Sequence, residues 1–270
     1  MAQPSDSPSN RDPDPPASLV GRTASHLGRL LPLAVVPLAT ALFRARELLA
    51  TGRANGVTIR ASFPVYRYDL WSFVDAPRSG VTVSLPFGSL DPLPLLVPLI
   101  GAYVVVSGAL SAGYFGSIAD GITTGRFGFV ASVRRFGVRM VLLEAIVIVA
   151  VAAVFLPLLV FPPLFVAAVL AALVLSYLYF PTVYVIALED RGIESAARRA
   201  RELVGRHRPL GFFLAVAVVT AVCSVPLGLL AHAGPGGALL AAVVAAPLGL
   251  AFNVATALKV AEMAEVETVE

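Results

Sequence analysis

Long stretches of apolar residues run through this chain of 270 residues, and they restrict its fold more than any other feature of the sequence. Five of them are long enough to cross, as helices, the roughly 30 Å hydrocarbon core of a bilayer, and they cover about 93–118, 140–161, 164–187, 210–231 and 238–260. With 57% hydrophobic and 14% charged residues, the chain has more apolar side chains than a soluble core would bury. We predict an all-α polytopic membrane protein, a helical bundle of about six transmembrane helices.

The first apolar stretch, 30–43, falls short of the roughly 17–25 residues that a spanning helix needs. Extending it to 27–49 reaches that length, because arginines near its ends can reach the lipid headgroups along their own side chains. A cleaved signal peptide is the alternative, but the leader before this stretch is long and rich in Pro and Asp rather than short and basic. We predict a spanning helix here.

The two ends of the chain are polar. Residues 1–18 are rich in Pro, Ser and Asp with almost no apolar side chains, so they cannot offset the entropy of ordering and are predicted to be disordered. Residues 262–270 form an acidic C-terminal tail. The predicted membrane domain therefore covers 19–261.

Residues 51–91 differ from the apolar stretches on either side of them. Apolar and polar side chains alternate along 57–63 and 81–87, and this period of two is typical of β-strands. Between these segments stand aromatic residues of the kind that settle at a membrane–water boundary: Tyr66, Tyr68, Trp71 and Phe73. We predict a small β-rich extracytoplasmic segment that lies on the membrane between the first and second helices.

Arginine is concentrated in two of the connections between apolar stretches. The links 119–139 and 188–208 are rich in arginine, whereas 157–163 and 232–237 contain no Lys or Arg. Short connections rich in positive charge stay in the cytoplasm. We predict that both links and both termini lie on the cytoplasmic side of the cell membrane. The arginines of 51–91 depart from this rule, which longer folded loops follow less strictly.

The second basic link has the pattern of an amphipathic helix. Its apolar residues recur at helical spacing, at Ile193, Ala196, Ala197, Ala200, Leu203 and Val204. The first link has a shorter stripe of the same kind, at Phe129, Val133 and Phe136. We predict amphipathic links on the inner leaflet, whose arginines either bind anionic lipid or a membrane-protein partner, or serve only as topology anchors: Arg134, Arg135, Arg198, Arg199 and Arg201.

Two polar residues inside the apolar stretches are candidate site residues. Glu144 is the one acidic residue within a predicted span, where a carboxylate marks a functional site or forms an ion pair near the boundary. Asn253 stands in a row of small residues spaced by four, from which an amide can form hydrogen bonds across a helix contact. Two further rows predict close packing of the second helix: Gly108, Ala112 and Gly116, beside Ala109, Gly113 and Ser117.

The sequence lacks the motifs of several enzyme classes. It contains no HExxH, no GxSxG, no phosphate-binding glycine loop and no paired intramembrane aspartates. Cys223 is the only cysteine, and the three histidines lie in unrelated segments, so we expect no metal site. The arginines adjoin apolar spans, which argues against nucleic-acid binding. We predict no cofactor and no enzymatic activity.

The stretch YLYFPTVYVIALEDRGIESAARRARELVGRHRPLGFFLAV, residues 177–216, resembles a pattern of uncharacterised six-helix membrane families of the DUF4013 and glycerophosphodiesterase membrane-domain type. Those families pair an aromatic-rich helix end with an acidic-Gly turn, an amphipathic Ala/Arg helix and the next span. Residues 112–136 are similar to the corresponding earlier link, so the resemblance covers about 93–260. It implies a six-helix architecture and transfers no site, because these families have no established activity.

Two functions remain open at this point. The first hypothesis is a non-enzymatic structural or accessory component of a membrane, indicated by the basic amphipathic links and by the shortage of ionisable residues within the spans. The alternative is a small-solute or ion permease, indicated by prolines within the predicted helices and by the polar residues Glu144 and Asn253.

Overall fold

The computed structural model describes residues 18–53, 62, 68–74, 93–155 and 161–269, and the following statements concern these residues. Six helical segments are long and apolar enough to cross a membrane, which confirms the predicted helical membrane architecture. They cover Leu19–Phe43, Pro98–Thr123, Phe129–Val154, Phe165–Glu189, Leu210–Ala231 and Pro235–Ala264.

The individual elements follow one another without a strand in the described part of the chain. In order, they are α1 (Leu19–Leu30), the 3₁₀ turn η1 (Leu31–Ala34), α2 (Val35–Phe43), α3 (Ala45–Thr51), the 3₁₀ turn η2 (Leu70–Ser72), α4 (Leu93–Thr123), α5 (Phe129–Phe155), the 3₁₀ turn η4 (Pro162–Leu164), α6 (Phe165–Tyr179), α7 (Thr182–Glu189), α8 (Ile193–His207), α9 (Leu210–Ala231) and α10 (Pro235–Ala264).

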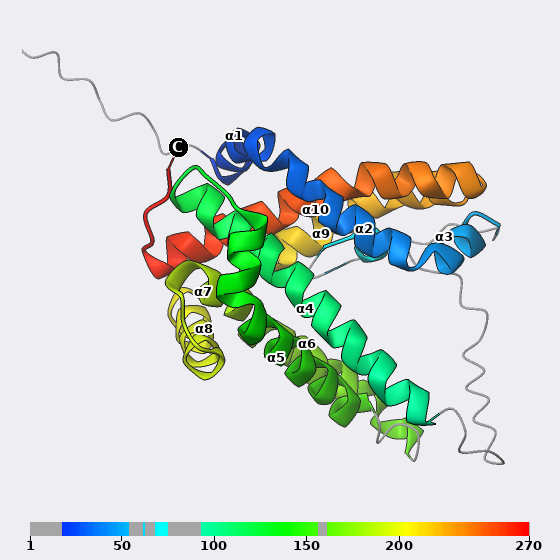
Figure 1. The fold of residues 1–270 in the computed structure, drawn as a ribbon, viewed down its shortest axis with the longest axis horizontal. Helices are drawn as coiled ribbons and strands as arrows, with labels where there is room; N and C mark the ends of the chain where they lie inside the picture. Colours follow the sequence, from blue (N-terminus) through cyan, green and yellow to red (C-terminus); the bar gives the residue numbers. More distant parts are fainter. Residues whose placement is uncertain (1–17, 54–61, 63–67, 75–92, 156–160, 270) are drawn as a thin grey trace, which may run out of the picture.

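Two groups of helices diverge from a common end of the molecule (Figure 1). The first group contains α4, α5 and α6, and the second contains α2, α3, α9 and α10. At the common end lie α1, α7, α8 and the C-terminal residues. There, Arg22 Nη2 donates to Thr268 Oγ1 over 3.0 Å, and the Val269 amide donates to the Ile122 carbonyl over 2.8 Å. The beginning of α1 and the end of the chain therefore lie on the same side.

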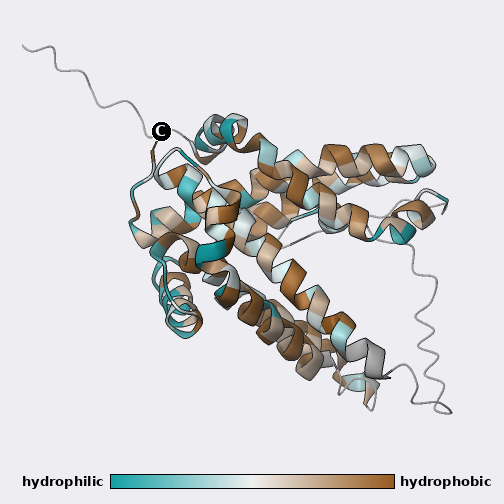
Figure 2. Cartoon of the chain, in the orientation of Figure 1, coloured by the Kyte–Doolittle hydropathy of each residue, from teal (hydrophilic) through white to brown (hydrophobic). Residues whose placement is uncertain are grey.

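Two clusters of buried apolar side chains hold the groups together. The larger cluster lies at the common end and draws on α1, α4, α5, α7, α8, α9 and α10. The smaller one joins α2, α3, α9 and α10 around residues 70–74. Figure 2 shows hydrophobic residues along the long helices, many of whose large apolar side chains are exposed, whereas hydrophilic residues gather at α1 and α8. Apolar outer surfaces of this extent fit helices that face lipid.

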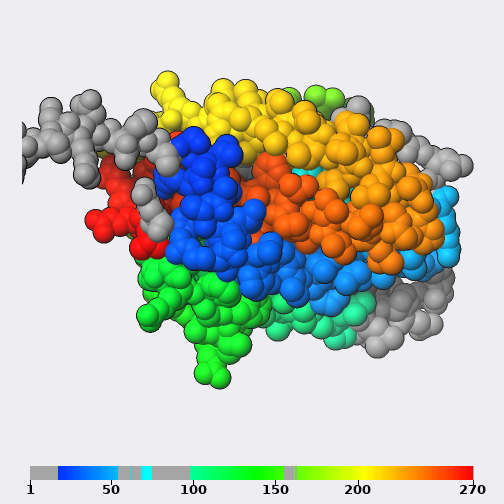
Figure 3. Space-filling model, turned by 90° about the horizontal axis from the view of Figure 1, so that it is seen from above, coloured from blue at the N-terminus to red at the C-terminus, as the bar shows by residue number. Residues whose placement is uncertain are grey.

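The first membrane segment is a broken helix rather than the single helix predicted over 27–49. The η1 turn, Leu31–Ala34, contains Pro32, which has no N–H to donate to a continuing α-helix, and Arg44 separates α2 from α3. Before this break, α1 buries Thr23, His26 and Leu30 and exposes its opposite face. In the space-filling view, α1 and α2 lie along α10 (Figure 3).

A β-rich segment between the first two spans is not supported. The predicted strands at 57–63 and 81–87 fall outside the described residues, apart from Ser62. The described residues 68–74 contain only the η2 turn, which begins at Asp69 as its N-cap.

Three of the four aromatic side chains predicted for that segment lie inside the bundle, so their predicted position on the membrane surface is wrong, and Tyr66 lies outside the described residues. Tyr68, Trp71 and Phe73 are all buried, and the Tyr68 and Phe73 rings stand 5.2 and 5.8 Å from the Phe252 ring of α10. Gly249 makes this possible, because a Cβ at that position would lie 2.6 Å from the Tyr68 carbonyl oxygen. The glycine therefore lets a non-helical segment pack against α10.

The two basic links also differ from their predicted form. Most of 119–139 belongs to α4 and α5, which are joined only by residues 124–128. Phe129 and Phe136 face α4, where a Cβ on Gly113 or Gly116 would collide with them. The predicted close packing of the second span is thus present, but the apolar stripe of this link contacts protein rather than the inner leaflet.

The prolines act in two different ways. Pro181 separates α6 from α7, as expected for a residue that interrupts helical hydrogen bonding. Pro98, Pro226 and Pro247 lie within continuous helices. Pro157 lies outside the described residues.

Candidate functional site

Asn253 forms the centre of a polar contact between three helices. Its side-chain nitrogen donates to the Tyr114 hydroxyl of α4 over 3.0 Å and to the Gly249 carbonyl over 2.9 Å. Its side-chain oxygen accepts a hydrogen bond from the Tyr184 hydroxyl of α7, also over 3.0 Å. Asn253, Tyr114 and Tyr184 are all buried. The amide thus uses both of its polar atoms to join α4, α7 and α10.

Aromatic rings enclose this polar centre. Phe115 meets the Tyr114 and Tyr184 rings edge-on, with centroid separations of 5.2 and 5.3 Å. Edge-to-face packing of this kind is favourable beyond the burial of area alone. The sequence predicted that Asn253 bonds across a helix contact, and the structure identifies the two tyrosines on the other side of that contact.

Glu144 lies at a different contact, between α5 and α4. The Ser107 hydroxyl donates to Glu144 Oε1 over 2.9 Å, and both residues are buried. Glu144 Oε2 is also buried and has no hydrogen-bond partner among the described residues. A buried polar atom left unpaired is costly, and Glu144 is the one acidic side chain among the buried groups of the described residues that have such an atom.

The two intramembrane candidates do not form one site. Glu144 contacts α4 at Ser107, whereas Asn253 contacts it at Tyr114. These two positions on α4 are about 10 Å apart along the helix axis, at about 1.5 Å per residue. The two polar residues that suggested a permease, Glu144 and Asn253, are therefore not in direct contact with each other.

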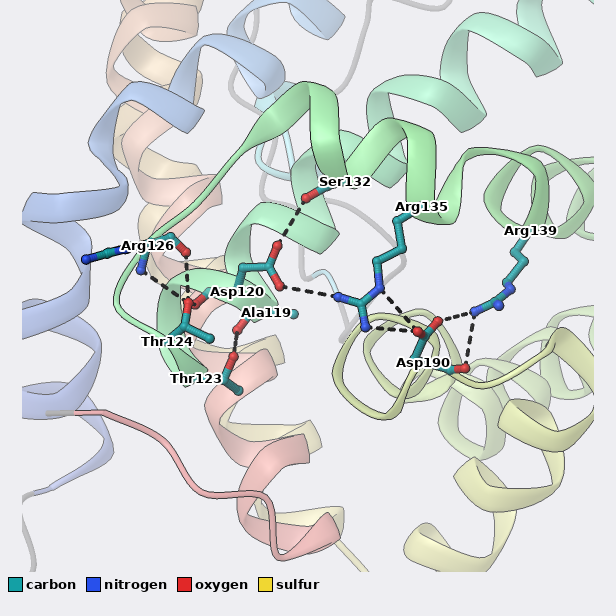
Figure 4. A network of polar contacts seen from close by, with 9 residues as sticks. All are labelled: Ala119, Asp120, Thr123, Thr124, Arg126, Ser132, Arg135, Arg139 and Asp190. Carbon is teal, nitrogen blue, oxygen red and sulfur yellow. Dashed lines mark hydrogen bonds and ion pairs between the residues drawn. The ribbon is translucent and has the colours of Figure 1, made fainter.

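A third polar cluster lies at the common end of the molecule and is centred on Asp190 (Figure 4). Arg135 of α5 donates from Nη2 and Nε to Asp190 Oδ2 over 2.9 and 3.2 Å, and Arg139 bonds to Oδ1 and to the Asp190 backbone carbonyl. On its other side, Arg135 lies 4.0 Å from an Asp120 oxygen of α4, and Ser132 donates to the same carboxylate. This Asp190 cluster ties α4 and α5 to the turn between α7 and α8.

The geometry of Asp190 explains its position and its charge. It ends α7 with a φ of 52°, a left-handed conformation that aspartate tolerates better than most residues. Hydrogen bonds from Arg135, and then from Arg139, lower the pKa of its carboxyl. The ionised Asp190 therefore stabilises the folded state at pH values above the ordinary pKa of an aspartate. This contribution is lost as the pH falls and the carboxylate is protonated, and exposure to solvent keeps the contribution small.

The predicted lipid or partner arginines divide into three groups. Arg135 and Arg199 make ion pairs within the protein, since Arg199 Nε lies 3.4 Å from Glu189. Arg198 pairs with Glu194 one turn away on the outer face of α8, and both side chains are largely exposed. Arg134 and Arg201 are exposed and pair with no acidic residue of the described chain. The five arginines therefore do not form one surface.

The apolar stripe of α8 packs against protein, and its prediction as a lipid-bound face is wrong. Ala196, Ala200, Leu203 and Val204 are buried, and α8 contacts α6, α7 and α10. The sequence showed the amphipathic period but not which apolar surface would cover the stripe. The neighbouring bundle does so here.

Several residues that matter to these clusters were absent from the sequence prediction. Serine and tyrosine are common in apolar spans, so Ser107, Tyr114 and Tyr184 gave no signal of their own. Only the rows of small residues near Ser107 and Tyr114 indicated a helix contact. Asp190 had a stronger signal, because it begins the acidic-Gly turn before α8. Its partners on α5, more than fifty residues earlier in the chain, were not identifiable.

Comparison with protein-family models, with curated proteins and with solved structures finds no match to this chain. The functional assignment therefore depends on the contacts described above.

Proposed function

We propose that this protein is a non-enzymatic accessory component of a membrane, and that the outer face of α8 binds a cytoplasmic part of a partner protein. This α8 outer face consists of Glu194, Arg198, Arg201 and Glu202. The observation that carries the proposal is the way α8 is held. Its apolar stripe is buried in the bundle, so its charged face is presented to solvent in a defined orientation.

Ion pairs at the start of α8 support a fixed orientation. Glu189, the last residue of α7, pairs with both Arg191 and Arg199. The Asp190 cluster ties the same turn to α5. A charged surface that is ordered before binding loses less conformational entropy when a partner docks.

The polar centre at Asn253 supports a structural role for the membrane helices. Both polar atoms of its side chain are engaged by groups of the protein itself. Such a centre joins helices, and neither the oxygen nor the nitrogen of the Asn253 side chain is left to bind a solute. We place α8 and both termini in the cytoplasm on the basis of the arginine bias, and the protein in the cell membrane.

Affinity purification with a C-terminal tag tests this proposal. We expect a partner protein to copurify with the intact protein at near-equal stoichiometry. Chemical cross-linking is expected to join this partner to α8. Charge reversal by Arg198→Glu with Arg201→Glu is expected to reduce its recovery more than tenfold, since like charges placed opposite each other cost several kcal/mol. Arg134→Glu is the control, because Arg134 is also exposed but lies on α5, outside the α8 outer face. Equal recovery with the α8 double variant would contradict the proposal.

A permease is the second candidate, and the unpaired oxygen of Glu144 is the observation that favours it. An unpaired carboxyl within a membrane span is a common part of a proton or cation pathway. If this function holds, purified protein in vesicles conducts H⁺ or Na⁺, and Glu144→Gln lowers the flux at least tenfold. Glutamine still accepts the Ser107 hydrogen bond, so the fold is retained.

The flux is measured with pH-sensitive and sodium-sensitive dyes enclosed in the vesicles. Glu202→Gln is the matched control, because it makes the same substitution on the exposed face of α8. Flux equal to that of protein-free vesicles would exclude this candidate for both ions.

A further inference from the structure

Exposed arginines at the common end of the molecule stand beside rows of exposed apolar side chains. Arg208 ends α8 in a left-handed conformation and directs the chain into α9 within two residues. From there, an exposed apolar row follows one face of the span at helical spacing: Leu210, Leu214, Val218 and Val222. Arg208 thus lies where the lipid-facing surface of α9 begins.

The same arrangement occurs at the start of α5. Val130 and Val138 are 63% and 76% exposed, and Arg134 stands between them on the same face of the helix. Leu142 continues this row toward the middle of the span. Arg134 therefore interrupts an otherwise apolar surface that faces lipid.

These two arginines differ from their neighbours in their contacts. Arg135 and Arg139 bond to Asp190, whereas Arg134 and Arg208 have no acidic partner in the described part of the chain. A guanidinium group remains charged at any ordinary pH, and it cannot remain unpaired beside hydrocarbon. Its long side chain reaches toward the headgroups, where its fork of donors matches the oxygens of a phosphate.

We propose that Arg134 and Arg208 bind the phosphates of anionic phospholipids at the end of the bundle where α8 lies. The Asp190 cluster holds the start of α5, which carries Arg134, at the common end of the molecule, and α8, which Arg208 ends, lies at the same end (Figure 1). The inference requires the six helices to be in a membrane. It does not depend on a partner for the α8 outer face.

Native mass spectrometry of the full chain in a non-ionic detergent tests the proposal, with phosphatidylglycerol compared with phosphatidylcholine of the same acyl chains. We expect tighter binding of phosphatidylglycerol. Each arginine near an anionic surface contributes about a fivefold factor, so Arg134→Gln with Arg208→Gln is expected to lower the affinity about 25-fold. Added salt should weaken the binding by the intact protein, and melting curves check that the variant is folded.

Arg198→Gln with Arg201→Gln is the control, because it removes the same charge from the α8 outer face and should leave lipid binding unchanged. Equal affinities of the intact protein for the two lipids would overturn the proposal, whether or not the variants fold. An equal loss in the control would also overturn it. So would displacement of the lipid by millimolar inorganic phosphate, which would point to a soluble phosphate ligand instead.

Discussion

Asn253→Leu is expected to lower the free energy of unfolding by about 3 kcal/mol, because it removes the polar centre that joins α4, α7 and α10. Leucine is close to asparagine in size but forms no hydrogen bond. The hydroxyls of Tyr114 and Tyr184 would both lose their bond to the amide in a buried environment. Reversible unfolding in mixed detergent micelles measures the change.

Single tyrosine substitutions divide this effect into its parts. Tyr114→Phe and Tyr184→Phe each remove one hydroxyl while keeping the ring contacts with Phe115, so each should cost about 1 kcal/mol. Tyr103→Phe is the matched control, since Tyr103 is an exposed tyrosine on the same helix as Tyr114. If Asn253→Leu were as stable as the native protein, the hydrogen bonds at Asn253 would make no net contribution.

Gly108→Leu is expected to be destabilising by about 3 kcal/mol, since it forces α4 and α5 apart. Even a Cβ at this position would lie 2.5 Å from the Cα of Val141, and a backbone atom cannot move aside as the end of a side chain can. The adjacent bond between Ser107 and Glu144 joins the same two helices, so it should be disturbed as well. Thermal unfolding in detergent measures the loss.

Gly101→Leu provides the matched control for this prediction. Gly101 lies on α4 as well, but a Cβ there meets nothing within 4 Å. Leucine has a higher helix propensity than glycine, so this variant should be as stable as the native protein or slightly more stable. Similar destabilisation of both variants would mean that close contact between α4 and α5 is not the cause.

Several details were readable from local patterns. The apolar lengths predicted six spans, and the rows of small residues on α4 predicted its close approach to a neighbour, which Gly108, Gly113 and Gly116 provide. Asn253 was correctly assigned to a helix contact. Patterns of this kind are local, because length and periodicity are properties of one segment.

The sequence by itself determined that this chain has several helices long and apolar enough to cross a membrane, since the lengths of the apolar stretches can be read directly from it. Only the tertiary structure decided which surface each amphipathic face meets. Periodicity shows that α8 has an apolar stripe and that residues 68–74 carry large aromatic rings, but both would fit lipid equally well. In the structure, α6 and α7 cover the apolar stripe of α8, and Gly249 leaves room beside α10 for residues 68–74. These contacts join segments that lie far apart in the chain, so no local pattern shows them.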